Sequence, residues 1–169
     1  MPTSGKLRMR PAMRFLCDEM LRGLGKWLRA AGYDTAIAEG GLPDRILAAR
    51  SAEEGRILLT KDRHLAGTAA GVARVVLIAG AGVDEDATSL RSVLGIDWQH
   101  APFTRCIVDN CPLELAPADL VARVPEGSRA AGGSVRVCPD CGRLYWSGGH
   151  VRRMQQRLIT WKTAPASRD

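Results

Sequence analysis

Four short apolar segments alternate with helix-like segments in the first hundred residues, and this alternation limits the fold more than any other feature. Continuous apolar runs of four or five residues are typical of strands that are buried on both faces. Strands that alternate with helices in this way predict a parallel sheet with helices on both sides, which is an α/β fold. The predicted strands span residues 14–17, 34–38, 56–60 and 74–78.

The segments that follow each run have the features of helices. From Met20 to Ala31 apolar residues recur at helical spacing, and Gly32 is placed to end that helix. The acidic residues at 84–86 suit the first turn of the last helix, where the helix dipole favours negative charge. The predicted helices span about residues 20–31, 43–52, 64–70 and 84–94.

Three aspartates fall where chemistry gathers in such a sheet. Asp18 and Asp62 directly follow strands, and Asp44 opens a helix, so all three belong to the carboxyl edge of the strands. Close carboxylates repel one another unless a cation lies between them, and carboxylates suit Mg²⁺ or Mn²⁺. Asp18, Asp44 and Asp62 are therefore candidates for a catalytic divalent-metal site. The alternative is that these residues cap helices.

Four of the five cysteines fall in the last third of the chain, as Cys106-x4-Cys111 and Cys138-x2-Cys141. In a cytosolic protein, paired cysteines of this kind are more often metal ligands than disulfides. The segment has few large apolar residues, so we expect it to fold as a zinc ribbon around a structural Zn²⁺. The fifth, Cys17, lies in a predicted strand and is expected to behave as a small buried hydrophobe.

The basic residues indicate a polyanionic partner. The net charge is +6, and between Cys141 and Arg168 there is no acidic residue. In the first helix, Arg22, Lys26 and Arg29 share one face, although such a stripe can also be a solvated surface. The candidates for phosphate contact are Arg22, Lys26, Arg29, Lys61, Arg63, Arg152, Arg153 and Arg157.

Several classes of protein are excluded or disfavoured. No segment has the ~18 unbroken apolar residues of a transmembrane helix, and no apolar stretch follows the basic residues near the start, as a secretory signal would require. There is no GxxxxGK[ST] phosphate loop, so a nucleotide cofactor is not expected, and His64, His100 and His150 lack partners for a nucleophilic triad. We expect a cytoplasmic protein whose residues 1–12 form a disordered arm.

The motifs resemble those of the Mut-seven C-terminal RNase domain family. The resemblance rests on Phe15-Leu-Cys-Asp-Glu-Met-Leu21, Arg56-Ile-Leu-Leu-Thr-Lys-Asp62, Cys138-Pro-Asp-Cys-Gly142 and Tyr145-Trp146, and it covers about residues 13–160. It implies a PIN-like nuclease domain followed by a zinc ribbon, with Asp18, Asp44 and Asp62 as the acidic cluster. The first cysteine pair is wider than the family's usual Cys-x2-Cys. Thr-Lys-Asp62 replaces the family's Thr-Arg-Asp.

We therefore expect a metal-dependent ribonuclease that hydrolyses RNA phosphodiester bonds, with the zinc ribbon aiding RNA binding. The expected organisation is a PIN-like nuclease domain at 13–98, a linker at 99–105, and a zinc ribbon with a basic C-terminal segment at 106–162. The alternative is a non-catalytic RNA-binding adaptor with the same fold. RNA is the expected partner in both hypotheses, and a membrane in neither.

Overall fold

The computed structural model describes residues 13–164, and the expected arm at 1–12 lies outside them. The first part of the chain alternates strands and helices, as the apolar runs predict. Its elements are β1 (Phe15–Cys17), the short 3-10 turn η1 (Glu19–Leu21), α1 (Arg22–Ala30), β2 (Thr35–Ile37), α2 (Asp44–Glu53), β3 (Ile57–Thr60), α3 (Arg63–Ala69), β4 (Val75–Leu77) and α4 (Val83–Leu94).

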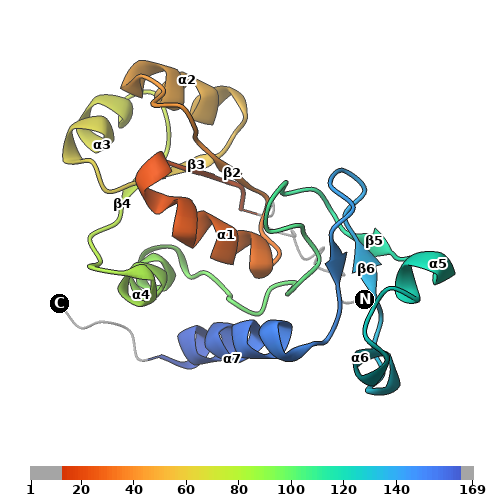
Figure 1. Cartoon of the computed structure of the whole chain (residues 1–169). Coiled ribbons are helices and arrows are strands. Elements are labelled where there is room, and N and C mark those ends of the chain that lie inside the picture. The colour runs from red at the N-terminus through yellow and green to blue at the C-terminus, as the bar shows by residue number, and fades with distance from the viewer. Residues whose placement is uncertain (1–12, 165–169) are drawn as a thin grey trace, which may run out of the picture.

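The four strands form one parallel sheet in the order β2-β1-β3-β4. Its register pairs Leu16 with Ala36 on one side and with Leu58 on the other. In Figure 1, α2 and α3 lie on one side of this sheet, and α4 and α7 (Gly149–Thr163) lie on the other. The predicted α/β architecture, a parallel sheet flanked by helices, is confirmed.

The core is divided by the sheet into two layers, because alternate residues of a strand point to opposite faces. Leu58 packs with Leu16 and Leu47 under α2 and α3. Its neighbours Ile57 and Leu59 pack on the other side with residues of α1, α4 and α7. Each fully buried aliphatic side chain of this kind contributes about 1.5–3 kcal/mol of transfer free energy.

The last third of the chain forms a second, smaller sheet. Its three antiparallel strands are only two residues long, and two short helices lie between the first two strands. These elements are β5 (Glu114–Leu115), α5 (Ala118–Val121), α6 (Glu126–Ala130), β6 (Arg136–Val137) and β7 (Leu144–Tyr145). They gather at the right of Figure 1, beside the first sheet.

Helix α7 returns to the first sheet, which the sequence analysis did not predict. Leu158 and Trp161 of α7 are buried in the same core layer as Leu28 and Leu90. Trp161 also packs edge-on against Trp27, with ring centroids 4.9 Å apart. The basic C-terminal segment is therefore one face of a helix whose other face completes the core of the parallel sheet.

The segment between the two sheets, residues 99–105, lies against α1. The N–H groups of Ala101 and Phe103 donate to the carbonyls of Ala31 and Ala30. This approach requires Gly32, because a Cβ there would lie 2.3 Å from the Ala101 carbonyl oxygen, and its φ of +96° also favours glycine. Among the helices of residues 13–164, none has the length and apolar character needed to cross a membrane.

Candidate active site and metal centre

The carboxyl edge of the parallel sheet has a topological switch point between β1 and β3. The chain leaves β1 toward β2 through α1 on one face, and it leaves β3 toward β4 through α3 on the other. In open α/β sheets, ligands bind in the crevice that such a divergence creates. Asp18 is the first residue after β1, and Asp62 is the second after β3, so the two aspartates flank this point.

Thr60 joins the two aspartates. Its hydroxyl Oγ1 donates to Asp18 Oδ2 at 2.8 Å and accepts from the backbone N–H of Asp62 at 2.9 Å. Thr60 is fully buried, whereas Asp18 is half-buried and Asp62 is exposed, so a buried hydroxyl orients two carboxylates that solvent can reach. Sequence reasoning did not assign Thr60 a role, because a threonine at the end of an apolar strand is also what β propensity favours.

The two aspartates differ in capping. Asp62 caps α3, since its Oδ1 accepts from the N–H groups of His64 at 2.7 Å and Leu65 at 3.2 Å. Asp18 precedes η1 but makes no side-chain cap. Within residues 13–164, no donor contacts Asp18 Oδ1 or Asp62 Oδ2. Each carboxylate therefore keeps one oxygen available to a ligand.

Asp44 is the first residue of α2 and lies at the same edge, since α2 begins where the chain returns from the carboxyl end of β2. The loop before it is held by Glu19, whose Oε2 accepts from the N–H of Gly41 at 3.3 Å. Among the described residues, the ligand oxygens of Asp18, Asp44 and Asp62 are not all within 4.8 Å of one another. The structure links Asp18 and Asp62 through Thr60 and brings Asp44 to their edge.

Lys61, a predicted phosphate contact, has an internal partner. Its Nζ lies 3.0 Å from Asp86 Oδ2 and donates to the Gly80 carbonyl at 2.7 Å. Asp86 is only 5% exposed, whereas the sequence suggested an ordinary helix-start acid. A buried carboxylate is stabilised by a paired cation, so this pair ties the end of β3 to α4. No sequence signal pointed to this pairing, because the two residues meet only through the fold.

The stripe on α1 divides into two roles. Arg22 pairs with Glu39 at 3.0 Å, and Lys26 is exposed without an ionic partner among residues 13–164. Arg29 is only 7% exposed, and its guanidinium donates to the carbonyls of Thr35, Ile107 and Val108. Arg29 thus joins α1 to the cysteine-rich segment. The three basic side chains line a pocket of about 330 Å³ with Ile37, Glu39 and Val108.

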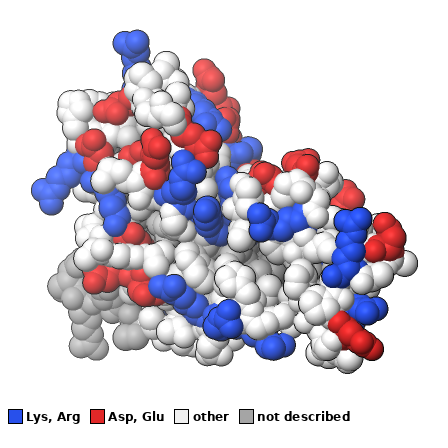
Figure 2. Space-filling model, viewed as in Figure 1, with Lys and Arg blue, Asp and Glu red and all other residues white. Residues whose placement is uncertain are grey.

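The basic residues of α7 also differ from one another. Arg157 makes two hydrogen bonds to Asp84, at 3.0 and 2.9 Å, and its guanidinium lies over the rings of Trp27 and Trp161. Arg152 donates to the Ser147 carbonyl, and Arg153 is exposed. Figure 2 shows Lys and Arg side chains over α1 and along α7 on a single face. Arg63, which follows Asp62, is exposed as well.

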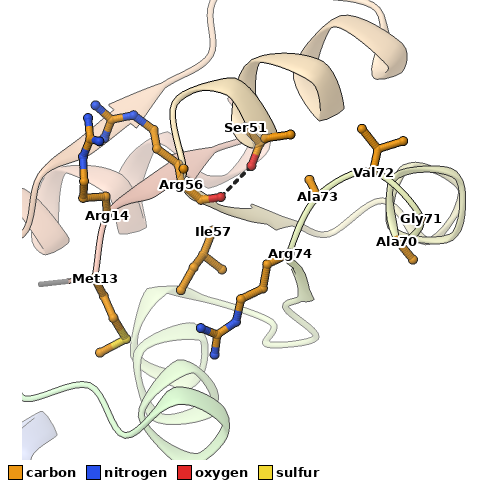
Figure 3. A pocket seen from close by; sticks show the side chains of 12 residues that line it. Met13, Arg14, Ser51, Arg56, Ile57, Ala70, Gly71, Val72, Ala73 and Arg74 are labelled. Atoms are coloured by element: carbon orange, nitrogen blue, oxygen red, sulfur yellow. Dashed lines mark hydrogen bonds between the residues drawn. The ribbon is translucent and has the colours of Figure 1, made fainter. Parts of the chain in front are cut away.

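A second pocket, of about 620 Å³, lies at the opposite, amino edge of the sheet (Figure 3). Arg14, Arg56 and Arg74 line it, and no acidic residue does. The Ser51 hydroxyl donates to the Arg56 carbonyl beside it at 2.8 Å. The acids and this pocket are thus on opposite edges, so the pocket is not part of the candidate active site.

The four cysteines of the last third, predicted to bind zinc together, lie close to one another. Cys106 Sγ lies 3.9 Å from Cys141 Sγ, and Cys111 Sγ lies 3.1 Å from Cys138 Sγ, and all are free thiols. Asp109, which the sequence analysis missed, lies among them. The ligand atoms that are all within 4.8 Å of one another belong to Cys106, Asp109, Cys138 and Cys141.

Two thiols of this cluster, Cys138 and Cys141, are poor acids without a cation. At Cys106 burial raises the pKa, but the hydrogen bonds from Tyr145 and from backbone N–H groups outweigh it and lower that pKa. Burial raises the pKa of Cys138 to about 11. The hydrogen bond to Asp109 raises the pKa of Cys141 to about 12. Zinc binds thiolates, so a donor set of sulfurs and one carboxylate fits a Zn²⁺ ion that displaces these protons.

Asp34 fastens the cysteine-rich segment to the parallel sheet. Its Oδ1 accepts from Arg56 at 2.8 Å and from Asn110 Nδ2 at 2.7 Å, while Oδ2 accepts from Arg14 at 3.0 Å. The Asn110 Oδ1 in turn accepts from the N–H of Thr35. Burial raises the pKa of Asp34, but the hydrogen bonds from Arg56, Asn110 and Arg14 outweigh it and hold that pKa well below its ordinary value.

Two comparisons relate this chain to known proteins. The family model described as Mut7-C RNAse domain matches residues 13–158. A human protein described as exonuclease mut-7 homolog is 31% identical over 104 residues, which are 59% of this chain and 12% of the human protein. This chain therefore spans only a small part of that relative's length. No solved structure matches the chain.

Proposed function

The chain belongs to the Mut7-C RNAse domain family, which is a family of nucleases, and from this premise we propose that it is a metal-dependent ribonuclease. The proposed reaction is hydrolysis of RNA phosphodiester bonds. Asp18, Asp44 and Asp62 would hold the divalent metal. The observation that carries the proposal is the hydrogen-bonded connection from Asp18 through Thr60 to Asp62 across the switch point.

The donor set at this edge fits Mg²⁺ or Mn²⁺. Both prefer carboxylate oxygens and keep several waters, and Asp18 and Asp62 each have one oxygen without a protein donor within residues 13–164. When bound, such an ion offsets charge that develops on the phosphate and lowers the pKa of a coordinated water. Thr60 holds the Asp18 carboxylate in place, and the α3 cap holds the Asp62 carboxylate.

The basic residues around this edge are suited to the substrate backbone. Lys26 and Arg63 are exposed and have no ionic partner within 13–164, and Arg22 has only exposed acids as partners. Lys and Arg at such positions contact phosphates whatever the base sequence is. The exposed face of α7, with Arg152 and Arg153, extends this basic surface. RNA is therefore the proposed partner.

We also propose that the cysteine cluster holds a structural Zn²⁺, and that the small sheet is a zinc ribbon that aids RNA binding. Its strands are two residues long, and its core cluster has only four buried residues, two of them cysteines. So small a core needs a metal to fold. Unpaired thiols persist in a reducing compartment, so we place the protein in the cytoplasm.

The test is cleavage of labelled single-stranded RNA by Asp18→Asn and Asp62→Asn variants, with Mg²⁺ or Mn²⁺ and with EDTA. Asparagine keeps the size of the side chain but removes the charge, so each variant should fold and bind RNA while losing cleavage. Asp119→Asn is the matched control, because Asp119 is exposed on α5, far along the chain from this edge. Wild-type cleavage rates in both active-site variants would contradict the assignment of Asp18 and Asp62. RNA binding by the wild type without any metal-dependent cleavage would support the adaptor hypothesis instead.

A further inference from the structure

We propose that Asp109, and not Cys111, is the fourth ligand of the zinc site, so that the ion is bound by three sulfurs and one carboxylate oxygen. This inference rests on the proposal that the cysteine cluster holds zinc. Cys111 is then a thiol beside the site that does not bind the metal. Two features of the structure lead to this assignment, and the charge of the site is compatible with it.

The backbone of the first cysteine turn follows a definite pattern. The N–H of Asp109 points to Cys106 Sγ at 3.4 Å, and the N–H of Asn110 donates to the Cys106 carbonyl at 3.0 Å. The N–H of Cys106 donates to the carbonyl of Cys111, five residues later, at 2.9 Å. Asn110 has a φ of +67°.

The second cysteine turn repeats this pattern residue by residue. The N–H of Cys141 points to Cys138 Sγ at 3.4 Å, and the N–H of Gly142 donates to the Cys138 carbonyl at 2.9 Å. The N–H of Cys138 donates to the carbonyl of Arg143 at 2.9 Å. Gly142 has a φ of +69°.

The two turns therefore correspond position by position. Cys106 corresponds to Cys138, and Asp109 corresponds to Cys141. Cys111 corresponds to Arg143, which is not a metal ligand. With Asp109 as the second ligand of the first turn, the ligand spacing is Cys106-x2-Asp109 in one turn and Cys138-x2-Cys141 in the other. The two turns are then equal in length.

The distances between ligand atoms agree with this correspondence. A tetrahedral zinc with ligands at about 2.0–2.3 Å separates those ligands by roughly 3.3–3.8 Å. Asp109 Oδ2 lies 3.4 Å from Cys106 Sγ and 3.3 Å from Cys138 Sγ, and Cys106 Sγ lies 3.9 Å from Cys141 Sγ. Cys111 is close to Cys138, at 3.1 Å, but lies outside the group whose ligand atoms are mutually within 4.8 Å.

The charge of the site is also suitable. Three thiolates and one carboxylate carry the same formal charge as four thiolates, so replacing a sulfur by Asp109 leaves the electrostatic balance with Zn²⁺ unchanged. Carboxylate is an established zinc ligand. The side chain of Asp109 is exposed, so its carboxylate is accessible to a zinc ion without any rearrangement of a buried environment.

X-ray absorption at the zinc edge of the purified wild-type protein tests the ligand set directly. We expect one zinc per chain with three sulfurs at about 2.3 Å and one oxygen at about 2.0–2.2 Å. Four sulfurs would overturn the assignment of Asp109 while leaving the zinc site itself standing. A wild-type protein without zinc would overturn both proposals.

A second measurement uses thiol chemistry and two variants. In zinc-loaded protein, iodoacetamide should modify Cys111, while the exposed Cys141 is protected by the metal. Cys111→Ser should keep one zinc per chain, and Asp109→Asn should weaken zinc binding at least about tenfold in competition with a chelator. Loss of zinc in Cys111→Ser, with normal affinity in Asp109→Asn, would reverse the assignment.

Discussion

The hydroxyl of Thr60 donates a hydrogen bond of 2.8 Å to Asp18 Oδ2, across the boundary between β3 and β1. The same oxygen of Thr60 accepts from the N–H of Asp62, so one buried side chain orients residues that follow two different strands. Because Asp18 Oδ2 accepts the hydrogen bond from Thr60, the other carboxylate oxygen of Asp18, Oδ1, is available to a ligand. The positioning role of Thr60 can therefore be tested by substitutions that leave Asp18 and Asp62 unchanged.

Thr60→Val should reduce RNA cleavage by about 10- to 100-fold, as expected for the loss of a group that orients metal ligands. Valine has the same shape but neither donates to Asp18 nor accepts from Asp62. We also expect a loss of about 1–3 kcal/mol in the free energy of unfolding, measured with urea, because buried polar groups lose their partner. Thr60→Ser restores the hydroxyl and should recover most of the cleavage. Equal cleavage by Thr60→Val and wild type would contradict the positioning role.

Removal of zinc should unfold the small sheet and leave helix α7 in place. With a chelator, hydrogen exchange should accelerate across residues 106–148, since that segment has few buried apolar side chains. The amides of α7 should stay protected, because Leu158 and Trp161 are buried against the parallel sheet. Mass spectrometry of the exchanged peptides measures the exchange of residues 106–148 and of α7 in one experiment. Adding zinc back is the control, and it should restore protection in 106–148. Simultaneous loss of protection in 149–163 would contradict this division.

The parallel sheet could be predicted from the sequence because the signals for its strands and helices come from residues that are near one another in the chain. Each strand is indicated by an apolar run such as 56–60, and each helix by residues that favour its start and its end. These signals lie within short stretches of sequence, so the order of the elements can be predicted without knowing the tertiary contacts. Helix α7 could not be found in this way. Its buried face is completed by Trp27, which lies more than a hundred positions earlier, and its exposed face reads as a basic tail.

The candidate sites show the same contrast. The positions of Asp18 and Asp62 after strands follow directly from the strand pattern, and the convergence of the four cysteines follows from their spacing. By contrast, the pairing of Lys61 with Asp86 and the carbonyl contacts of Arg29 join distant segments. Charge alone made these residues resemble phosphate contacts. Asp109 was missed because a carboxylate between two cysteines gives no metal signal until the backbone turns are compared.

Asp34 predicts how the stability of the protein depends on pH. Its folded pKa lies below its unfolded value of about 3.9, so its ionic contacts stabilise the fold above pH ~4, and this stability is lost as pH falls toward the folded pKa. Asp34→Asn should therefore cost about 2 kcal/mol at pH 7. The difference between variant and wild type should shrink below pH ~4. Urea unfolding of both proteins between pH 7 and pH 3 measures it, and a difference that stays constant over the whole range would contradict the assignment.

The salt dependence of RNA binding should separate the exposed basic residues from the paired ones. Lys26, Arg63 and Arg153 are exposed and have no ionic partner within residues 13–164, so their charges are available to phosphates. Replacing all three by alanine should lower the slope of log K against log salt by up to about 2, at roughly 0.7 for each single-strand phosphate contact. Fluorescence anisotropy with a labelled single-stranded RNA at several salt concentrations gives this slope.

The matched control removes the same charge elsewhere. Arg74 lies at the amino edge of the sheet, and Arg123 and Arg129 lie beside α5 and in α6, and all three are exposed. Their triple alanine variant should weaken RNA binding slightly through the lower net charge but keep the slope near the wild-type value. If the two triple variants lowered the slope equally, the RNA would be responding to overall charge, and the proposed contacts at Lys26, Arg63 and Arg153 would be wrong.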